Sequence, residues 1–374
     1  MSSAVICGFA RSPFTPANKG ALAKTRPDDI LAAVIKGLIA KTGVKPADIE
    51  DVIIGTAFPE GEQGFNIGRM VALLAGLPET VAGATVNRWC GSSMEAIHIA
   101  AGKIANGAGE VFICGGVESM TRIPMGGYNP LPNPGLYKNY PQAYMSMGLT
   151  AEEVATQCSI SRADMEKFAL SSHQKAAKAD FSDEIIPIET RDGVVSKDGT
   201  IRADSTLEAM ATLEPAFKKG GTVTAATSSP LTDGASAVLV CSEDYAKKNK
   251  LTILARIKSM AVAGLKPEVM GLGPVDASKK ALQRAGITAK DLDVAELNEA
   301  FSAQAIPCMN QIGIDPDKVN MEGGAIALGH PLGASGARIT GKAALLLHKK
   351  RGKYALASMC IGGGMGIATV LEKI

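Results

Sequence analysis

The sequence predicts an α/β protein built from two similar halves with a long insertion between them. Three observations support this prediction. Apolar, strand-like stretches alternate with helical ones, one segment recurs at a constant offset of 243 residues (43 to 286), and 374 residues exceed the usual size of a single core. The 41 glycines gather in clusters, as expected where tight turns join strands to helices or where backbone lies close to a ligand.

The repeat begins with residues 43–58, GVKPADIEDVIIGTAF, which match residues 286–301, GITAKDLDVAELNEAF. Each copy follows a predicted helix, over residues 30–41 and 277–284, and ends in a short apolar strand. Small-residue turns then open apolar helices at Cys-Gly-Ser-Ser (90–93) and His-Pro-Leu-Gly (330–333), and each is followed by a strand that ends in glycines. Three parallels in the same order favour duplication, and we expect each half to be a mostly parallel sheet covered by helices.

The insertion interrupts this rhythm, so we expect three parts. They are an N-terminal half (residues 1–116 with 232–250), an inserted loop domain (117–231) and a C-terminal half (251–374). Within the insertion, residues 123–141 are rich in Pro, Gly, Tyr and Met and predict an irregular loop, whereas residues 150–180 predict a helix capped by Thr150 and Glu153. An insertion this long is a natural place for ligand contacts, and an oligomerisation arm is the alternative.

Composition argues against several classes of partner. The net charge is only +2 and no run of five or more like charges occurs, so neither nucleic acid nor a membrane surface is expected as a partner. No stretch of 18 apolar residues predicts a membrane span, and the first residues lack the pattern of a signal peptide. The seven cysteines are widely spaced without a CxxC pair, which disfavours structural zinc and a disulfide framework. We therefore expect a cytoplasmic protein with reduced thiols and no metal.

Cys90 is the first candidate for chemistry. Residues 84–90 predict a strand that leads into a turn, and residues 91–97 open a helix rich in alanine. A thiol at a helix N-terminus is close to unpaired N–H groups that favour the thiolate. A sharp strand-to-helix turn also exposes the side chain, as in a nucleophile elbow. The alternative is a cysteine that packs beneath the turn as a small apolar residue.

Only four histidines are present, and His330 differs from the other three. His98, His173 and His348 have structural explanations: packing within a helix, an exposed polar helix surface, and a favourable charge at a helix C-terminus. Gly329 before His330, and Pro-x-Gly after it, hold its ring at a tight turn. Cys360 is a further candidate, because it follows a predicted strand and precedes a run of glycines whose N–H groups can point at one oxygen, as in an oxyanion hole. A glycine-rich hairpin without function is the alternative.

Taken together, four motifs resemble those of the thiolase family, and the resemblance covers essentially the whole chain. They are Asn87-x-x-Cys90-Gly91-Ser92-Ser93, Asn298-Glu299-Ala300-Phe301, Gly329-His330-Pro331-x-Gly333-x-Ser335-Gly336-Ala337-Arg338 and Cys360-x-Gly362-Gly363-Gly364-x-Gly366. The resemblance implies duplicated βαβαβαββ halves that form a five-layer α-β-α-β-α core, with an inserted loop domain.

The resemblance also implies a role for each motif residue. Cys90 is the nucleophile that accepts the acyl group, and His330 is the base that activates it. Cys360 protonates the acetyl-CoA enolate and deprotonates the incoming CoA thiol. One oxyanion hole is formed by His330 with a water held by Asn298, and a second by the N–H groups of Cys90 and Gly362. Coenzyme A is a substrate, and no cofactor or metal is required.

For the rest of the substrate, the resemblance implies a set of binding residues. They are Arg202 near the nucleotide, Met210 and Phe217 along the pantetheine, Ser229 hydrogen-bonded to it, and Met147, Met270 and Phe301 around the acyl group. Two departures from the family pattern occur here. The usual Gly-Asn before the coenzyme A serine is Ala226-Thr227, and Ser146 stands where acetoacetyl-specific members carry histidine.

The function implied is reversible cleavage of 3-ketoacyl-CoA by CoA to acyl-CoA and acetyl-CoA, as in fatty-acid β-oxidation. A biosynthetic acetyl-CoA acetyltransferase specific for acetoacetyl-CoA is the alternative, and Ser146 argues against it. A condensing enzyme of the ketoacyl-synthase kind would not need Cys360. A function of a different class is a non-catalytic carrier of acyl-CoA or lipid. Such a carrier would be expected to have lost a catalytic residue. A homodimer or homotetramer is expected.

Overall fold

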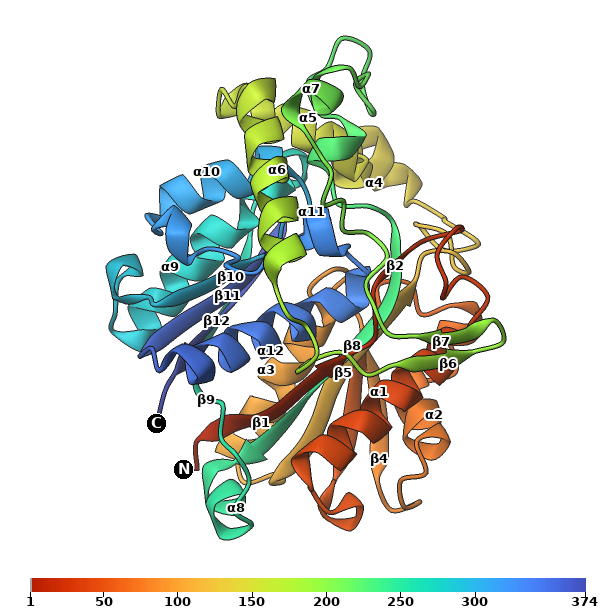
Figure 1. The fold of residues 1–374 in the computed structure, drawn as a ribbon, viewed down its shortest axis with the longest axis vertical. Coiled ribbons are helices and arrows are strands. Elements are labelled where there is room, and N and C mark those ends of the chain that lie inside the picture. The colour runs from red at the N-terminus through yellow and green to blue at the C-terminus, as the bar shows by residue number, and fades with distance from the viewer. Residues whose placement is uncertain (1) are drawn as a thin grey trace.

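The computed structural model describes residues 2–374, which form two α/β halves side by side with a smaller, mainly helical region above them (Figure 1). The strands are β1 (Ala4–Arg11), β2 (Thr15–Pro16), β3 (Asp51–Gly55), β4 (Ala82–Val86), β5 (Val111–Ser119), β6 (Ile188–Thr190), β7 (Gly193–Val195), β8 (Thr232–Ser242), β9 (Ala255–Gly264), β10 (Val294–Leu297), β11 (Tyr354–Ile361) and β12 (Met365–Glu372). The α-helices are α1 (Pro27–Thr42), α2 (Ile67–Leu74), α3 (Ser92–Ala105), α4 (Pro134–Asn139), α5 (Met147–Gln157), α6 (Arg162–Lys178), α7 (Leu207–Ala211), α8 (Glu243–Lys248), α9 (Gly273–Ala285), α10 (Ser302–Ile312), α11 (Ala325–Leu328) and α12 (Leu332–Lys350).

The strands of both halves hydrogen-bond in the order β10-β11-β12-β9-β1-β8-β5-β3-β4, and β2 adds to β8. The halves meet where β1 pairs briefly with β9, through Val5 with Arg256 and Ile6 with Ala255. The prediction of mostly parallel sheets is wrong. Only β3–β4, β3–β5 and β10–β11 are parallel, whereas β8, β1, β9 and β12 join antiparallel. The reason is visible at β11 and β12, which form a tight hairpin through glycines, and a hairpin forces antiparallel pairing.

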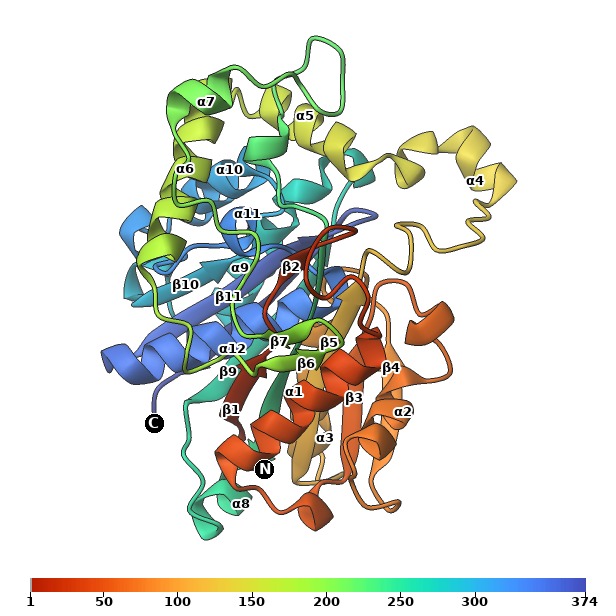
Figure 2. The same ribbon diagram turned by 45° about the vertical axis from the view of Figure 1, so that its right-hand side comes forward.

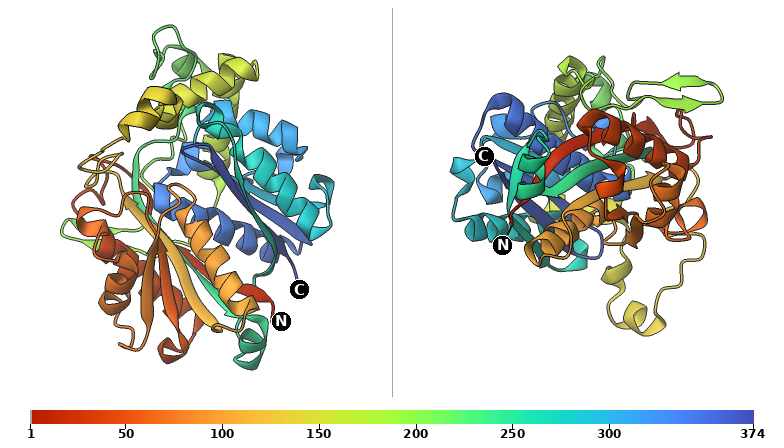
Figure 3. Two further views of the ribbon diagram at one scale, coloured as in Figure 1. Left: turned by 180° about the vertical axis from the view of Figure 1, so that it is seen from behind. Right: turned by 90° about the horizontal axis from the view of Figure 1, so that it is seen from below.

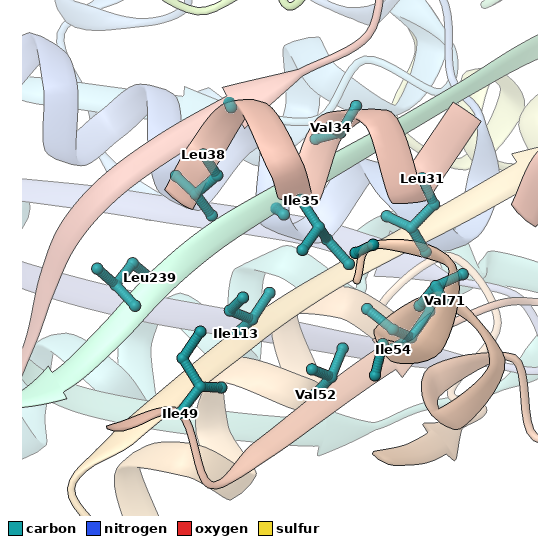
Figure 4. Close-up of a cluster of buried hydrophobic side chains, with 14 of the residues drawn as sticks. Leu31, Val34, Ile35, Leu38, Ile49, Val52, Ile54, Val71, Ile113 and Leu239 are labelled. Carbon is teal, nitrogen blue, oxygen red and sulfur yellow. The ribbon is translucent and has the colours of Figure 1, made fainter. Parts of the chain in front are cut away.

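Three hydrophobic clusters lie between five layers, which confirms the five-layer α-β-α-β-α arrangement. In the first, Leu31, Ile35 and Leu38 of α1 pack on Ile113 of β5 and Leu239 of β8 (Figure 4). The second lies around α3 and α12, between the two halves of the sheet (Figure 3). The third lies where α9 and α10 cover the outer face of β9–β12. The helices that follow Cys90 and His330 are therefore both in the central layer.

Helix α12 is buried over most of its length, because its glycines allow neighbouring backbone to approach closely. A Cβ atom added to Gly336 would lie 2.4 Å from the backbone nitrogen of Met94 on α3. Beside it, the backbone N–H of Ala337 donates to Ser93 Oγ at 2.8 Å. The small-residue motif after His330 thus brings the starts of α12 and α3 together.

The insertion differs in detail from its prediction. Instead of one helix over 150–180, α5 and α6 are separated at Cys158–Ser161, where Ser159 has a φ of 54°. Thr150 is not a cap, because α5 begins at Met147 and the Thr150 hydroxyl donates to Met147 O at 2.7 Å. Helix α4 extends away from the body of the molecule (Figure 2). Within residues 2–374 no helix combines the length and the apolar character that a membrane crossing needs.

Buried ion pairs connect the insertion to the core. Arg11 of β1 is fully buried and contacts Glu184 at 2.6 Å and Asp198 at 2.7 Å, both from the insertion. Lys342 of α12 also contacts Glu184, at 2.7 Å. Burial is costly for each charge, so these groups depend on one another for stabilisation.

Candidate active site

The turn that carries Cys90 lies between β4 and α3. Asn87 holds it from both ends of its amide: Oδ1 accepts from the Trp89 N–H at 2.8 Å, and Nδ2 donates to Ala57 O at 3.0 Å. Trp89 has a φ of 43°, a left-handed conformation that is uncommon for a bulky residue and often found at functional sites. This turn sets the Cys90 side chain beside Leu332, Ala57 and Met120.

The pKa of Cys90 is raised and not lowered, contrary to the prediction, because burial outweighs the N–H groups beside the thiol. Burial of the thiol raises its pKa to about 11, and the charge of Glu118 raises it further, while the N–H groups of Gly362 and of Cys90 itself lower it. The thiol is therefore protonated at rest and needs a nearby base to become a nucleophile. The same two N–H groups are those expected around an acyl oxyanion.

His330 lies immediately before α12 and is 4% exposed. Its Nδ1 is 2.6 Å from Ser335 Oγ, and the Ser335 hydroxyl donates to Pro331 O at 3.0 Å. Because that hydroxyl proton is used, Nδ1 carries the ring proton and Nε2 carries the lone pair. Burial, followed by the charge of Arg338, lowers the pKa of His330 to about 3, so the ring is neutral and able to accept a proton.

Asn298 follows β10 and faces this ring. Its Nδ2 lies 3.4 Å from His330 Nε2, and its backbone N–H donates to Ser358 O on β11 at 3.0 Å. Its Oδ1 is buried and has no hydrogen-bond partner among residues 2–374. Asn298 therefore presents a donor, Nδ2, and an unpartnered acceptor, Oδ1, beside the His330 ring.

Cys360 lies near the end of β11, and the glycines after it contact the Cys90 turn. Gly363 and Gly364 have φ values of 75° and 82°. A Cβ atom added to Gly363 would lie 2.6 Å from the Trp89 ring, and one added to Gly362 would lie 2.9 Å from it. Burial raises the pKa of Cys360 well above its usual value, and the charge of Cys90 adds to this rise, as expected of two neighbouring thiols.

The residues expected around the acyl group also come together. Met270 and Phe301 are buried in one cluster with Cys360, and Met147 packs against it. Phe217 is 41% exposed and meets the Phe301 ring edge to face at 5.8 Å. Apolar side chains thus surround the Cys360 side of the site.

A cavity of about 310 Å³ lies between the insertion and the C-terminal half. Arg202 and Met210 line it, together with Ser228 and Pro230 on either side of Ser229. The remaining lining residues are Pro16, His173, Gly199, Thr200, Ser205, Thr206, Ala209, Leu213, Ala225, Ala226 and Ile326. Of the residues expected along coenzyme A, the structure therefore brings Arg202 and Met210 into one cavity. Ser229 is not among the lining residues, although both its neighbours are, and Phe217 lies with the acyl cluster.

Glu118, at the end of β5, is a site residue that the sequence analysis missed. Its carboxylate is buried and accepts from the N–H groups of Ala57 and Gly333, each at 2.8 Å, and from Gln63 Nε2 at 2.6 Å. Burial raises the pKa of Glu118 in spite of these bonds. The available signal was a lone acidic residue two positions after the Gly-Gly of a strand that is otherwise apolar. Glu118 ties the loop beside Cys90 to the start of α12.

No group of three or more His, Cys, Asp or Glu side chains within residues 2–374 is arranged to hold a metal ion. The seven cysteines are all free.

Comparison with known proteins agrees with these motifs. Residues 4–244 match the family described as thiolase, N-terminal domain, and residues 251–373 match thiolase, C-terminal domain. The chain is 45% identical to a 3-ketoacyl-CoA thiolase of Bacillus subtilis and 48% identical to one of Vibrio cholerae, over the full length of both chains in each case. The structure of human mitochondrial 3-ketoacyl-CoA thiolase in complex with CoA superposes with a TM-score of 0.91, at 37% identity, covering 100% of this chain and 98% of that one. The resemblance found in the sequence is confirmed, and the chain belongs to the thiolase family.

Proposed function

We propose that this chain is an acyltransferase that cleaves 3-ketoacyl-CoA with CoA to give acyl-CoA and acetyl-CoA, by a reversible reaction that passes through an acyl-Cys90 intermediate. The observation that carries the proposal is that a Cys90 thiol kept protonated by burial packs against Leu332, two residues after a neutral His330 whose Nε2 carries the lone pair. The full-length relatives named 3-ketoacyl-CoA thiolase support the same reaction.

In the first half of the reaction, Cys90 attacks the 3-keto carbon while His330 Nε2 takes the thiol proton. The bond between carbons 2 and 3 then breaks. Its electron pair moves into the departing acetyl-CoA enolate, and Cys360 donates a proton to carbon 2. Burial keeps Cys360 protonated at rest, which suits it to this step. The acyl group remains on Cys90 as a thioester.

In the second half, the Cys360 thiolate takes the proton of an incoming CoA thiol. The new thiolate attacks the acyl-Cys90 thioester, and Cys90 leaves and recovers its proton from His330. All proton transfers use side chains of this chain, so thiol and imidazole chemistry is sufficient and CoA enters only as substrate.

We propose that two sets of donors stabilise the charged oxygens. Asn298, whose Oδ1 has no partner within the described residues, is suited to hold a water beside His330 Nε2 for the enolate oxygen. The N–H groups of Cys90 and Gly362, which already interact with the Cys90 sulfur, are suited to the acyl oxygen. Removing one donor from an oxyanion hole typically costs about 10²–10³ in kcat.

For the substrate range, we propose broad or medium-chain 3-ketoacyl-CoA and a place in fatty-acid β-oxidation. Ser146 at the start of α5 is small, and Met147, Met270 and Phe301 line an apolar region beside Cys360. An acetoacetyl-specific enzyme is the alternative. We propose that the insertion, residues 117–231, carries the coenzyme A arm through Arg202, Met210, Phe217 and Ser229, and that 1–116 with 232–250, and 251–374, are the two halves.

We further propose a homo-oligomer in the cytoplasm. Strand β4 is the outer edge of the sheet, and α2 beside it exposes Leu73 and Leu74, while Phe65 before α2 is 92% exposed. Such an edge favours pairing with a second chain. Seven free cysteines suit a reducing compartment. Light scattering on the purified protein tests the oligomer, and Leu73→Lys should weaken it.

The function is tested by cleavage of acetoacetyl-CoA and 3-ketooctanoyl-CoA by wild type, Cys90→Ser and Cys360→Ala. Cys158→Ser, at a thiol outside the site, is the matched control. We expect cleavage by wild type and the control only, with 3-ketooctanoyl-CoA preferred. Incubated with octanoyl-CoA, Cys360→Ala should still gain one acyl group by mass spectrometry, whereas Cys90→Ser should gain none. Binding of CoA by a wild type that cleaves neither substrate would favour the carrier function instead.

A further inference from the structure

Asn320 completes the hydrogen bonding of the strand that leads to Asn298. Strand β10 is at an edge of the sheet, where the backbone groups that face outward need partners other than a strand. The backbone N–H of Asn320 donates to Ala295 O at 2.9 Å. Its side-chain amide accepts from the Leu297 N–H at 2.9 Å and donates to Leu297 O at 2.8 Å. Asn320 therefore takes the place of a neighbouring strand just before Asn298.

The conformation of Asn320 suits this role. It has a φ of 45° and is 2% exposed. Asparagine tolerates the left-handed region better than most residues, because its short polar side chain can hydrogen-bond to nearby backbone. A buried residue persists in this region where the surrounding structure holds it, and such residues are often found at functional sites.

Glu299 holds the chain on the other side of Asn298. Its side chain is 2% exposed, and Oε1 accepts from Asn320 Nδ2 at 2.7 Å. Oε2 accepts from the Ser172 hydroxyl at 2.7 Å and from the Ile326 N–H at 3.2 Å. Burial raises the pKa of Glu299, while these three hydrogen bonds lower it. The carboxylate therefore depends on its donors, and the donors are held in place by it.

Ser172 brings the insertion into this network. It lies on α6, is 3% exposed, and also accepts from the Gly324 N–H at 3.0 Å. The next residue, His173, is 5% exposed, so this part of α6 is buried and is not the exposed surface that was expected. Asn320, Glu299 and Ser172 together form what we call the Asn298 support.

His330, by contrast, is held by hydrogen bonds of its own. Its backbone N–H donates to Thr232 Oγ1 at 3.1 Å, and its Nδ1 is bonded to Ser335 Oγ. Neither bond involves the Asn298 support. The 3.4 Å between Asn298 Nδ2 and His330 Nε2 thus depends on two separate sets of contacts, one for each side chain. Loss of the Asn298 support should move Asn298 while the base stays in place.

We propose that the three residues of the Asn298 support are positioning residues for the enolate step: they hold the Asn298 amide beside His330 and take no part in acyl transfer. This inference rests on the proposed function, in which Asn298 serves the enolate oxygen and His330 alone activates Cys90. A misplacement of about 1 Å can cost about 100-fold in rate. Weakening the support should therefore slow cleavage of the carbon–carbon bond and leave acyl transfer intact.

Three substitutions weaken the support at different points. Glu299→Gln keeps the shape of the side chain but turns an N–H₂ group toward one set of its donors. Asn320→Gly keeps the left-handed backbone without strain and removes the amide. Ser172→Ala removes a single hydroxyl, so it keeps the test available if the other two variants do not fold. The matched control is Asp51→Asn, at a buried carboxylate in the N-terminal half that pairs with Lys103 at 2.6 Å.

Two reactions separate the steps. A single turnover of 3-ketooctanoyl-CoA without added CoA releases acetyl-CoA through the enolate and leaves a hexanoyl group on Cys90. Exchange of the hexanoyl group between hexanoyl-CoA and isotopically labelled CoA passes through the same acyl-Cys90 but forms no enolate. We expect Glu299→Gln and Asn320→Gly to slow the first reaction about 10- to 100-fold, and Ser172→Ala to slow it less. The exchange should keep its wild-type rate in all three variants, and Asp51→Asn should change neither reaction.

Equal slowing of both reactions would show that these residues only support the fold, and unchanged rates would show that they do not position Asn298. Either result, with an active wild type, would overturn the inference and leave the proposed function standing. The double variant of Glu299→Gln and Asn320→Gly should be no slower than the slower single variant, because both act through Asn298, and losses that multiply would contradict this. A wild type that carries out neither reaction would overturn the proposed function, and the inference with it.

Discussion

His330 and Ser335 form a hydrogen-bonded pair one turn apart at the start of α12, with Nδ1 2.6 Å from Oγ. The pair fixes which ring nitrogen carries the proton, because the Ser335 hydroxyl already donates to Pro331 O. The lone pair on Nε2 is therefore a consequence of a serine five residues further along the chain. Ser335 belongs to the motif that begins at Gly329, and the structure shows that it orients the His330 ring.

Replacing Ser335 with Ala should lower kcat about 10- to 100-fold, because the ring loses the acceptor that holds its tautomer and orientation. The KM for 3-ketoacyl-CoA should change little, and Ser335→Thr should restore activity. Steady-state kinetics tests this, with Ser278→Ala as the control, because Ser278 is an equally buried hydroxyl on α9 without a partner within residues 2–374. Wild-type kcat in Ser335→Ala would contradict the assigned tautomer.

Replacing Glu118 with Gln should reduce both stability and kcat. Oε2 accepts from the N–H groups of Ala57 and Gly333, and Oε1 accepts from Gln63 Nε2. An amide would turn its N–H₂ group toward one of these two sets of donors, so at least one buried donor loses its acceptor. The expected loss is about 2 kcal/mol in the free energy of unfolding. Urea denaturation followed by circular dichroism measures it. Glu79→Gln, at an exposed position, should leave both quantities unchanged.

Replacing Arg11 with Met should destabilise the protein by about 3–5 kcal/mol, because Asp198 and one oxygen of Glu184 would then be buried without their cation. The matched control is Lys24→Met. Lys24 pairs with Asp192 at the surface, where both side chains are more than two-thirds exposed, and its loss should not be measurable. Equal unfolding midpoints in urea for the two variants would refute the anchoring role of Arg11.

His98 should make the protein less stable in acid. Its Nε2 lies 2.8 Å from Thr369 Oγ1, and burial, followed by the charge of Arg88, lowers its pKa to about 3. The unfolded chain, with an ordinary pKa near 6.5, binds the proton more readily, so stability is complete above that pH and falls as the pH drops toward 3.

Protonation linked to His98 should lower the free energy of unfolding by about 1 kcal/mol per pH unit between pH 6 and 4. His98→Gln should remove this share of the slope in urea unfolding measured at several pH values. His348→Gln, at the exposed end of α12, should not. A parallel slope in His98→Gln and wild type would exclude His98 as the group responsible.

Much of the site was predictable because its residues stand at the ends of strands and the starts of helices. Cys90, Asn298, His330 and Cys360 each lie at such a junction, and small residues mark the turns. The duplication also predicted which helices are equivalent. These are local or repeated patterns, which a single sequence carries well.

What the sequence analysis missed depends on distant contacts. The antiparallel direction of β8 and β9 is set by where the chain returns after the insertion, not by their residues. The raised pKa of Cys90 results from burial by Leu332 and Met120, which outweighs the helix terminus. Burial of His173 results from the loop at Arg202, which no pattern within α6 indicates.

Strand β1 also determines when folding can be completed. It lies in the middle of the sheet, where Val5 pairs with both Cys241 of β8 and Arg256 of β9. During synthesis, β1 leaves the ribosome long before either partner exists, and both its faces are apolar. The nascent chain must therefore keep an apolar, aggregation-prone strand unpaired until the entire insertion has been translated. Such a high contact order predicts slow folding and a dependence on chaperones that a protein with sequential strand pairing would not have.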